Sequence, residues 1–524
     1  MEEAEFAGRL YGLLSATQYF RTHPENLITA DSHGYPLTRS VVALVRGTGR
    51  RTVVLAGHFD TVSVANYGTL APLAFDPVSL CAALIAELED RPRNGSEDRV
   101  LADLKSGSFM PGRGLLDMKS GLAAGIAAME RFAELAELTG NLLFIATPDE
   151  ENASRGMRSV RDALPEITRR FEIDIAGGIN LDASSCEKDG EEGRAIYLGS
   201  IGKYLPFAFA VGRSTHAGYP FAGISAHLIA AEIVRAIDTN PELRDEAHGE
   251  LSPAPVCLEV KDLRSAYDVT TPDRVWLAFN WLTHRRNAPE LLNAFESEVH
   301  QAMDRAIAGQ RNNSFRATGS AATVAGTLLN YAGLRERVSA RGGADALQRL
   351  DALEAELLGN NNPLAVTQRL VDAAVTEASI EGPAVVVGFG GLHYPLVHLD
   401  RFGESGGSFH AAIRSIIPLI EERYGISIKD KQIFAGISDM SFLGHRQEKE
   451  QSHLLAANTP AAAYTDNANE DLLAFPVVNI GPWGRDYHQK WERMHAPYTF
   501  NVLPDLIFEA AAACLADVFH DCRI

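Results

Sequence analysis

Apolar runs alternate with amphipathic helical patterns over the first 200 residues of the chain. Residues 41–46 and 52–56 are short apolar runs typical of buried strands. Residues 121–138 predict an amphipathic helix, because apolar side chains recur at spacings of three and four: Leu122, Ile126, Met129, Phe132 and Leu135. Two more apolar runs, 141–148 and 176–184, predict further strands. This alternation favours an α/β layered fold with a largely parallel sheet.

The pattern changes near residue 200. An apolar run at 204–212 leads through a polar turn to a predicted helix at 222–238. Strand-like runs at 255–262 and 274–283 follow, and then a predicted helix at 288–308. This order predicts a small α+β domain with its own sheet.

The remaining segments complete both predicted parts of the chain, the α/β part and the small α+β domain. Residues 312–380 are rich in Ala, Arg and Glu at helical spacing, and residues 383–391 predict a last strand for the small domain. A helix around 407–423 and a strand at 475–481 return to the first layer. We therefore predict an α/β protein of two domains. A three-layer domain with a mixed, mostly parallel sheet comprises residues 1–199 and 399–524. An inserted α+β domain comprises residues 200–398 and includes a helical elaboration at 312–380.

Composition narrows the class of protein. The chain has 524 residues and a formal net charge of −20, whereas a nucleic-acid-binding surface would be basic. No apolar stretch approaches the ~20 residues that a membrane helix needs, and the acidic start is unlike a signal peptide. The five cysteines are scattered without a C-x-x-C pair, which fits a reducing compartment. We expect a cytoplasmic protein with a small-molecule substrate and no nucleic-acid or membrane partner.

Polar residues with metal-binding chemistry follow several of the predicted strands. Each motif alone is weak, because a lone acid in a loop is usually a helix cap or a solvated turn. The motifs are AGHFDTV (56–62) with His58 and Asp60, GRGLLDMKSG (112–121) with Asp117, TPDEEN (147–152) with Glu150 and Glu151, NLDASS (180–185) with Asp182, and NIGPWGRDYHQKWERMH (479–495) with His488 and His495.

Taken together, these motifs predict a two-metal site. The carboxyl ends of parallel strands meet at one edge of a sheet, and His, Asp and Glu are ligands suited to zinc or a similar divalent ion. Two ions need about three ligands each, one of them shared. His58 and Asp182 are expected at one ion, Glu151 and His488 at the other, and Asp117 between them. Glu150 is then left as the general base.

The motifs in their order resemble the aminoacylase/carboxypeptidase-type family of di-zinc metallopeptidases, and they span residues 57 to 492. The chain length and the closing sequence GPWGRDYHQKWER are most similar to the subgroup of the arginine-utilisation protein RocB. The resemblance implies a metal-dependent hydrolase that cleaves an amide bond in a small peptide or N-acyl amino acid, in arginine or other amino-acid catabolism. It also implies two divalent ions, zinc first, with cobalt or manganese as alternatives.

The resemblance also implies individual roles. Asp60 would orient His58 without binding metal, and the peptide bond after Asp117 would be cis. Glu150 would carry a proton from water to the leaving amine. His216, in GRSTHAGYPFAGISA (212–226), is similar to the family's lid histidine, which faces the oxyanion, often from a neighbouring subunit. The inserted domain would thus be a lid or dimerisation domain. The oligomeric state stays open between a homodimer and a monomer in which residues 312–380 take the place of the dimer partner.

Several alternatives stay open at this stage. Arg285 and Arg286, in THRRNAP (283–289), fall near the family's lid arginine and are weak substrate-binding candidates, since a solvated basic turn fits equally well. His495 competes with His488, although the H-x-x-x-E spacing to Glu492 favours His488. Asp439 is expected to support the site structurally. A catalytically silent relative that binds a ligand or partner, and a two-metal phosphoesterase, are the competing functions.

Overall fold

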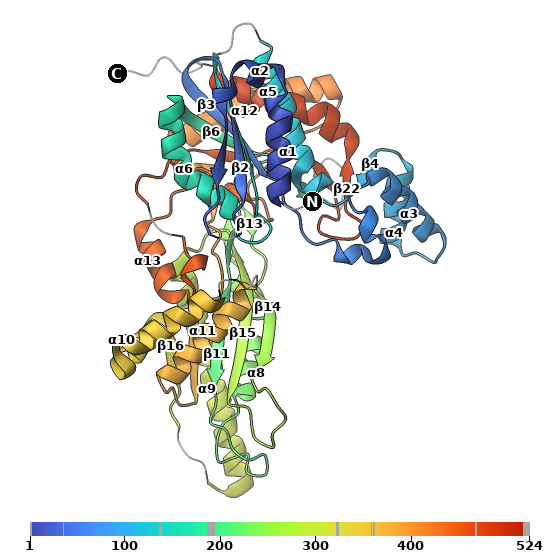
Figure 1. Cartoon of the computed structure of the whole chain (residues 1–524). Helices are drawn as coiled ribbons and strands as arrows, with labels where there is room; N and C mark the ends of the chain where they lie inside the picture. The colour runs from blue at the N-terminus through green and yellow to red at the C-terminus, as the bar shows by residue number, and fades with distance from the viewer. Residues whose placement is uncertain are drawn as a thin grey trace. The chain divides into compact units, whose positions relative to one another are not determined.

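The computed structural model describes residues 3–34, 36–135, 139–185, 194–320, 324–357, 359, 362–466 and 469–516. The chain forms two compact units (Figure 1). The first comprises Met1–Ser200, Val397–Arg446 and Asp471–Ile524, and the second comprises Ile201–Leu396 and Gln447–Glu470. Residues 447–470 thus fold with the second unit, whereas the sequence pattern grouped them with 399–524. The reason is α13 (Lys449–Asn458), which packs on elements of the second unit through the buried Leu455.

The first unit is built on an eight-stranded mixed sheet, as predicted. The strands lie in the order β1 (Leu27–Asp31), β2 (Arg39–Arg46), β5 (Thr139–Thr147), β3 (Thr48–His58), β6 (Asp174–Asn180), β20 (Val477–Asn479), β8 (Ala195–Tyr197) and β19 (Lys429–Lys431). The four central neighbours, from β5 to β20, run parallel, while β1, β2 and β8 pair antiparallel. The carboxyl ends of these four strands therefore meet at one edge.

Both faces of this sheet are buried, which explains its unbroken apolar runs. Val53 and Leu55 point to one core, whereas Val54 points to the opposite face. The first core is filled from α1 (Glu3–Ser15), α5 (Ser120–Ala133), α12 (Gly403–Tyr424) and α14 (Leu503–Leu515). The other face carries α6 (Arg155–Phe171), which contacts β1, β2 and β5 (Figure 1). The first unit is thus the predicted three-layer α/β structure.

The second unit has its own sheet, with helices on both faces. Its strands are β10 (Gly202–Tyr204), β11 (Pro206–Val211), β14 (Val256–Asp262), β15 (Arg274–Thr283), β16 (Thr327–Asn330) and β17 (Ala384–Phe389). Alternate residues of β15, such as Leu277 and Ala278, point to opposite cores. One core is covered by α8 (Ala226–Ile237) and α9 (Ala288–Thr318), and the other by α10 (Tyr331–Leu357) and α11 (Pro363–Glu377).

The segment predicted as a helical elaboration, 312–380, is not helical throughout. It contains the strand β16, which pairs parallel with β17. The run is only four residues long, too short for its period to stand out among helical neighbours. The helix predicted at 288–308 is also longer than expected and continues to Thr318. Its last ten residues lack an apolar stripe, and Gly319 ends it with φ 72°.

A helical insert, defined as residues 65–105, separates β3 from β4 (Phe109–Pro111) and was not anticipated from the sequence. It contains η2 (Ala65–Leu73), α3 (Pro77–Glu89) and α4 (Gly95–Lys105). Its small core is distinct from the main core of the first unit and includes Tyr67, Leu80, Leu84, Leu88, Val100 and Leu104. The insert lies beside β4 and β22 (Arg493–His495) (Figure 1).

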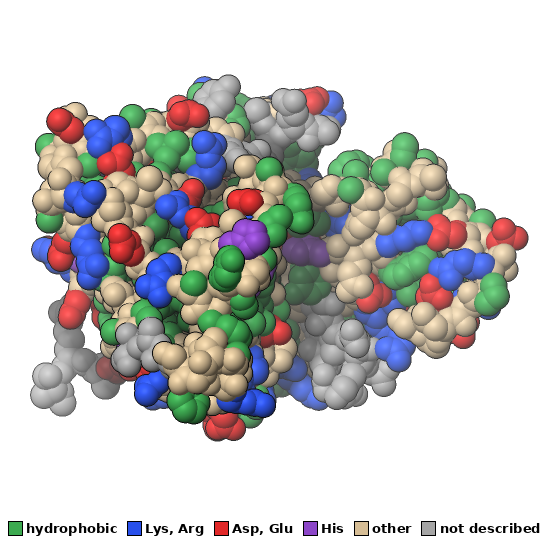
Figure 2. Space-filling view, turned by 90° about the horizontal axis from the view of Figure 1, so that it is seen from below, with side chains coloured by type: hydrophobic (Ala, Val, Ile, Leu, Met, Phe, Trp, Pro, Cys, Tyr) green, Lys and Arg blue, Asp and Glu red, His purple; other side chains and the backbone are tan. Residues whose placement is uncertain are grey.

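Acidic and basic side chains are interspersed on the face shown in Figure 2, and neither sign forms one continuous patch there. Among the residues that the structure describes, no helix is both long and apolar enough to cross a membrane.

The main core supplies a test of the fold. Leu55→Ala, at a position with 0 % exposure, is expected to cost about 2–5 kcal/mol in unfolding free energy, because it leaves a cavity among close-packed side chains. Leu13→Ala is the matched control, since Leu13 is 70 % exposed and its loss should cost about 0.5 kcal/mol or less. Urea unfolding curves of both variants measure the difference. Equal effects of the two substitutions would contradict the described core.

Candidate active site

The central strands deliver polar side chains to one edge of the first unit. β3 ends on His58, β5 is followed by Glu150 and Glu151, and β6 is followed by Asp182. The segment after β20 carries His488. Asp117 comes from the short η3 (Leu115–Lys119), just before α5, and the Asp117–Met118 peptide bond is cis, as the resemblance implied. All six side chains belong to the first unit.

One group of ligand atoms surrounds the buried imidazole of His58. Its Nε2 lies 3.2 Å from Oδ1 of Asp117 and 3.8 Å from Oδ1 of Asp182. The Nε2 atom also lies 3.8 Å from Oε2 of Glu150. His58, Asp117 and Asp182 offer ligand atoms within 4.8 Å of one another and are all buried. This first half-site matches the expected grouping of His58 with Asp182.

A second group shares Asp117. Its Oδ2 lies 2.8 Å from Nε2 of His488, which is also 3.2 Å from Oε1 of Glu151. Asp117, Glu151 and His488 again offer ligand atoms within 4.8 Å of one another. The His488 side chain is 41 % exposed, so this second half-site opens to solvent. Asp117 therefore lies between the two half-sites, with one carboxylate oxygen toward each.

Asp60 supports the site without facing the shared centre. Its Oδ1 lies 3.3 Å from Nδ1 of His58, the ring nitrogen turned away from Asp117. Its two carboxylate oxygens accept hydrogen bonds from the backbone amides of Glu150 and Glu151, at 3.1 and 3.0 Å. One buried carboxylate thus holds the imidazole of His58 and the turn that carries both glutamates.

The electrostatics of the cluster follow from burial and close charge. Burial would raise the pKa of Asp117, but the imidazoles of His488 and His58 outweigh it, so the pKa of Asp117 falls. Burial would lower the pKa of His58, but the carboxylates of Glu150, Asp117 and Asp182 outweigh it, so the pKa of His58 rises. Asp117 and Glu151 likewise overcome burial and raise the pKa of His488 to about 10. Burial raises the pKa of Asp182 to about 6, and it raises that of Glu150 well above its usual value, although His58 opposes this.

The donor set fits a divalent metal ion. Nε2 of His58 is buried and makes no hydrogen bond to any described residue. It faces carboxylate oxygens, which leaves room for a cation as the common partner. Two imidazoles and three carboxylates, with one carboxylate shared, are nitrogen and oxygen donors of the type found in zinc and related sites. Two groups of side chains that could hold ions share Asp117: His58, Asp117 and Asp182 form the first half-site, and Asp117, Glu151 and His488 form the second. A third group in the same cluster, His58, Glu150 and Glu151, also brings ligand atoms together.

Close backbone packing fixes Asp182. A Cβ atom on Gly481 would collide with the carbonyl of Asp182, and one on Gly121 would collide with the carbonyl of Leu181. The amide side chain of Asn479 also holds Asp182, since it accepts from the Asp182 amide at 3.1 Å and donates to its carbonyl at 2.9 Å. The role of Asn479 could not be predicted from the sequence, because a single Asn at the end of a strand is not distinctive.

The structure separates His488 from His495. His495 lies in β22, its ring packs 5.0 Å from that of Phe109 and 4.7 Å from that of Trp483, and burial lowers its pKa to about 4. It is not part of either group of ligand atoms around Asp117. Asp439 is buried beside the site, where its Oδ2 accepts from the Thr147 hydroxyl at 2.7 Å.

Three predicted residues belong to the second unit. His216 is exposed, and its Nδ1 accepts from the Gly218 amide at 3.0 Å. Arg285 is exposed, while the Arg286 guanidinium donates to the Leu243 carbonyl at 2.5 Å and lies over the Trp281 ring. The structure thus distinguishes the two arginines, which the sequence pattern did not.

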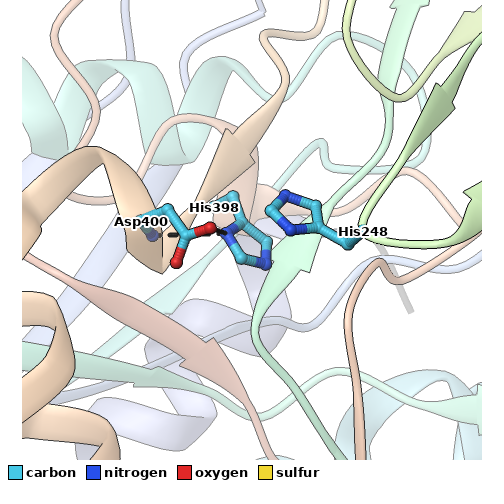
Figure 3. Close-up of side chains that lie close together, drawn as sticks. All are labelled: His248, His398 and Asp400. Carbon is cyan, nitrogen blue, oxygen red and sulfur yellow. Dashed lines mark hydrogen bonds and ion pairs between the residues drawn. The ribbon is translucent and has the colours of Figure 1, made fainter.

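A further histidine of the first unit has a structural contact. His398 Nδ1 accepts from the Asp400 amide at 3.2 Å and lies 3.4 Å from its carboxylate (Figure 3). His398 thereby caps η5 (Leu399–Phe402). Figure 3 also labels His248, which is an exposed residue of the second unit.

Comparison with known proteins identifies the family. The model of the peptidase family M20/M25/M40 matches residues 96–521. The chain belongs to this family. It is 31 % identical over 522 residues to the uncharacterized protein YqjN of Bacillus subtilis, covering 98 % of this chain and 93 % of that protein. It is 28 % identical over 513 residues to Protein RocB of the same organism, covering 94 % of this chain and 88 % of RocB.

A solved structure supports the M20 fold. The aminopeptidase PepT of Bacillus cereus is 14 % identical, with a TM-score of 0.51 and coverage of 98 % of this chain and 95 % of that chain. Membership of the M20 family makes the protein a metal-dependent hydrolase of amide bonds.

The contact between Gly481 and Asp182 yields a prediction. Gly481→Ala is expected to displace Asp182 and reduce the metal content of the protein, because the new methyl group meets backbone rather than a flexible side chain. Gly407→Ala in α12 is the control, since a Cβ there meets nothing within 4 Å. Elemental analysis after dialysis measures bound metal. Unchanged metal content in Gly481→Ala would show that Asp182 needs no such packing.

Proposed function

We propose that the protein is a two-metal amidohydrolase whose ions are held by His58, Asp117 and Asp182 and by Asp117, Glu151 and His488. The observation that carries this proposal is the convergence of these five side chains, with the buried Nε2 of His58 facing only carboxylates. Zinc is the proposed ion, with cobalt or manganese as alternatives, because imidazole and carboxylate donors accept all three. Such ions polarise a carbonyl and lower the pKa of water.

Glu150 is the proposed general base. Its carboxylate is buried next to the first half-site, and a raised pKa suits a group that accepts a proton and gives it up again. It would take a proton from water and deliver it to the leaving amine. Asp60 would keep the Nδ1–H tautomer of His58, so that Nε2 stays available as a ligand.

We assign the remaining roles to the second unit. His216 is the proposed donor to the oxyanion. Since its Nδ1 accepts from the Gly218 amide, the neutral ring carries its proton on Nε2 and can donate from there. Arg285 is preferred over Arg286 for a substrate carboxylate, because the guanidinium of Arg286 is already engaged.

The proposed substrates are short peptides or N-acyl amino acids in amino-acid catabolism. The chain is 27 % identical to the succinyl-diaminopimelate desuccinylase of Nitratiruptor over 41 % of its length and 55 % of that protein. The name of that enzyme describes an acylated amino acid as its substrate, which supports N-acyl amino acids as a substrate class here. We also propose a cytoplasmic location, which the free thiols of Cys81, Cys257 and Cys514 support.

Replacement of Glu150 tests the mechanism. Glu150→Gln is expected to lower kcat by about 10²–10⁴-fold while metal content stays near that of the wild type, because the amide keeps the shape but cannot accept the proton. A panel of dipeptides and N-acyl amino acids, assayed together with elemental analysis, measures both quantities. Wild-type turnover in this variant would refute the assignment of the base.

Arg285 gives a second test. Arg285→Ala is expected to raise KM for a substrate with a free carboxylate by about tenfold or more, as a charged hydrogen bond is lost. The same substrate with that carboxylate converted to an amide is the control and should be insensitive to the substitution. Equal changes for both substrates would argue against carboxylate binding by Arg285.

A further inference from the structure

The segment that carries His488 has an unusual backbone. Asp486 and His488 both lie in the left-handed region, with φ of 54° and 63°. Residues other than glycine adopt this conformation only at a cost in free energy, so the surrounding contacts must hold them. His488 is also the most exposed of the five proposed ligands, so burial does not fix its position.

Glu492 joins this segment to the one that carries Asp117. Its carboxylate is fully buried, and Oε2 accepts from the His488 amide at 3.0 Å while Oε1 accepts from the Gly114 amide at 3.2 Å. Oε2 also forms an ion pair with the buried guanidinium of Arg113. One carboxylate therefore holds the backbone on both sides of the Asp117–His488 contact.

Arg113 extends the connection to the helical insert. Its second amino group donates to Oδ1 of Asn66 at 3.0 Å, and Nδ2 of Asn66 donates to the His488 carbonyl at 2.9 Å. The guanidinium also lies 5.4 Å from the Tyr67 ring, within the core of the insert. Both backbone polar groups of His488 are thus held, the amide by Glu492 and the carbonyl by Asn66.

The insert is anchored to the same segment at separate points. Oδ2 of Asp103 accepts from Arg485 at 2.8 Å and from Nη2 of Arg493 at 2.7 Å. Lys490 pairs with Glu87 on α3. These contacts flank His488 on both sides along the chain, so the insert is tied to the segment before and after this ligand.

We propose that Glu492, Arg113 and Asn66 are positioning residues that set His488 against Asp117, and that the helical insert serves to anchor them. The proposal rests on the proposed two-metal function. It predicts that disturbing these residues weakens the second half-site, made of Asp117, Glu151 and His488, and spares the first half-site around His58.

Two variants test the proposal with Co²⁺ as the probe. Glu492→Gln removes the charge that holds Arg113. Asn66→Asp keeps the acceptor for Arg113 but places an oxygen against the His488 carbonyl, and it alters an exposed residue. Each is expected to weaken the second Co²⁺ by about tenfold or more, as loss of a group that orients a ligand does elsewhere. Binding of the first Co²⁺ should stay within about threefold of wild type.

Asn94→Asp is the matched control, because it makes the same charge change in the same insert. Asn94 caps α4 through hydrogen bonds with Glu97, and Asp is an equally good cap. Visible absorption of Co²⁺ during titration of metal-free protein follows each ion, and circular dichroism checks the fold.

The outcomes separate the two levels of inference. Selective loss of the second ion in Asn66→Asp, with Asn94→Asp unchanged, supports the positioning role. Two ions at wild-type affinity in both variants, or equal weakening of both ions in Asn66→Asp, would overturn it. Failure of the wild type to bind Co²⁺ would instead remove the proposed metal function and this proposal with it.

Discussion

The structure depends on holding like charges together in a buried place. Asp117, Asp182 and Glu150 all lie within 4 Å of Nε2 of one imidazole, and burial penalises each charge. Without cations such a cluster would separate or take up protons. The opposing shifts in the pKa of Asp117 and His58 show how the chain balances it by pairing carboxylate with imidazole. A divalent ion provides the same neutralisation with more charge, so a cluster that is costly for folding alone is suited to binding metal.

The backbone, rather than the ligand atoms, does the holding. The side chain of Asn479 hydrogen-bonds the backbone amide and carbonyl of Asp182. The carboxylate of Asp60 accepts from the backbone amides of Glu150 and Glu151. Glu492 and Asn66 likewise hydrogen-bond the backbone amide and carbonyl of His488. None of these contacts uses Nε2 of either histidine. The ligand atoms therefore stay available while their positions are fixed from behind, which is the condition for a preorganised site.

The sequence allowed the central part of this arrangement to be predicted, because one rule of sheet geometry was enough. Strands that read as buried runs end at His58, Thr147 and Asn180, and parallel strands bring such ends together. Contacts that depend on tertiary packing could not be predicted in this way. Asn479 lies 297 residues from Asp182 along the chain, and although it opens the motif at 479–495, nothing in that motif indicates the contact. The contacts of Arg113 and Glu492 could not be predicted for the same reason, although these residues lie within the motifs at 112–121 and 479–495.

The helical insert was not predicted for a different reason. Leu80, Leu84 and Leu88 recur every fourth residue, which is a helix signal that strand-end reasoning passes over. The likewise unexpected length of α9 has another cause, since its last turns have no apolar face and so no period to detect.

The insert also makes sense of a difference between the two half-sites. His58 ends a central strand and is enclosed by the core, so regular pairing with β5 and β6 holds it. His488 lies beyond the sheet in an irregular, exposed segment with left-handed backbone, where no ladder of hydrogen bonds reaches it. A ligand in such a place needs an anchor that is itself folded. A helical pair with its own apolar core, tied to the segment through Asp103 and Glu87, meets that need, whereas a simple loop would not.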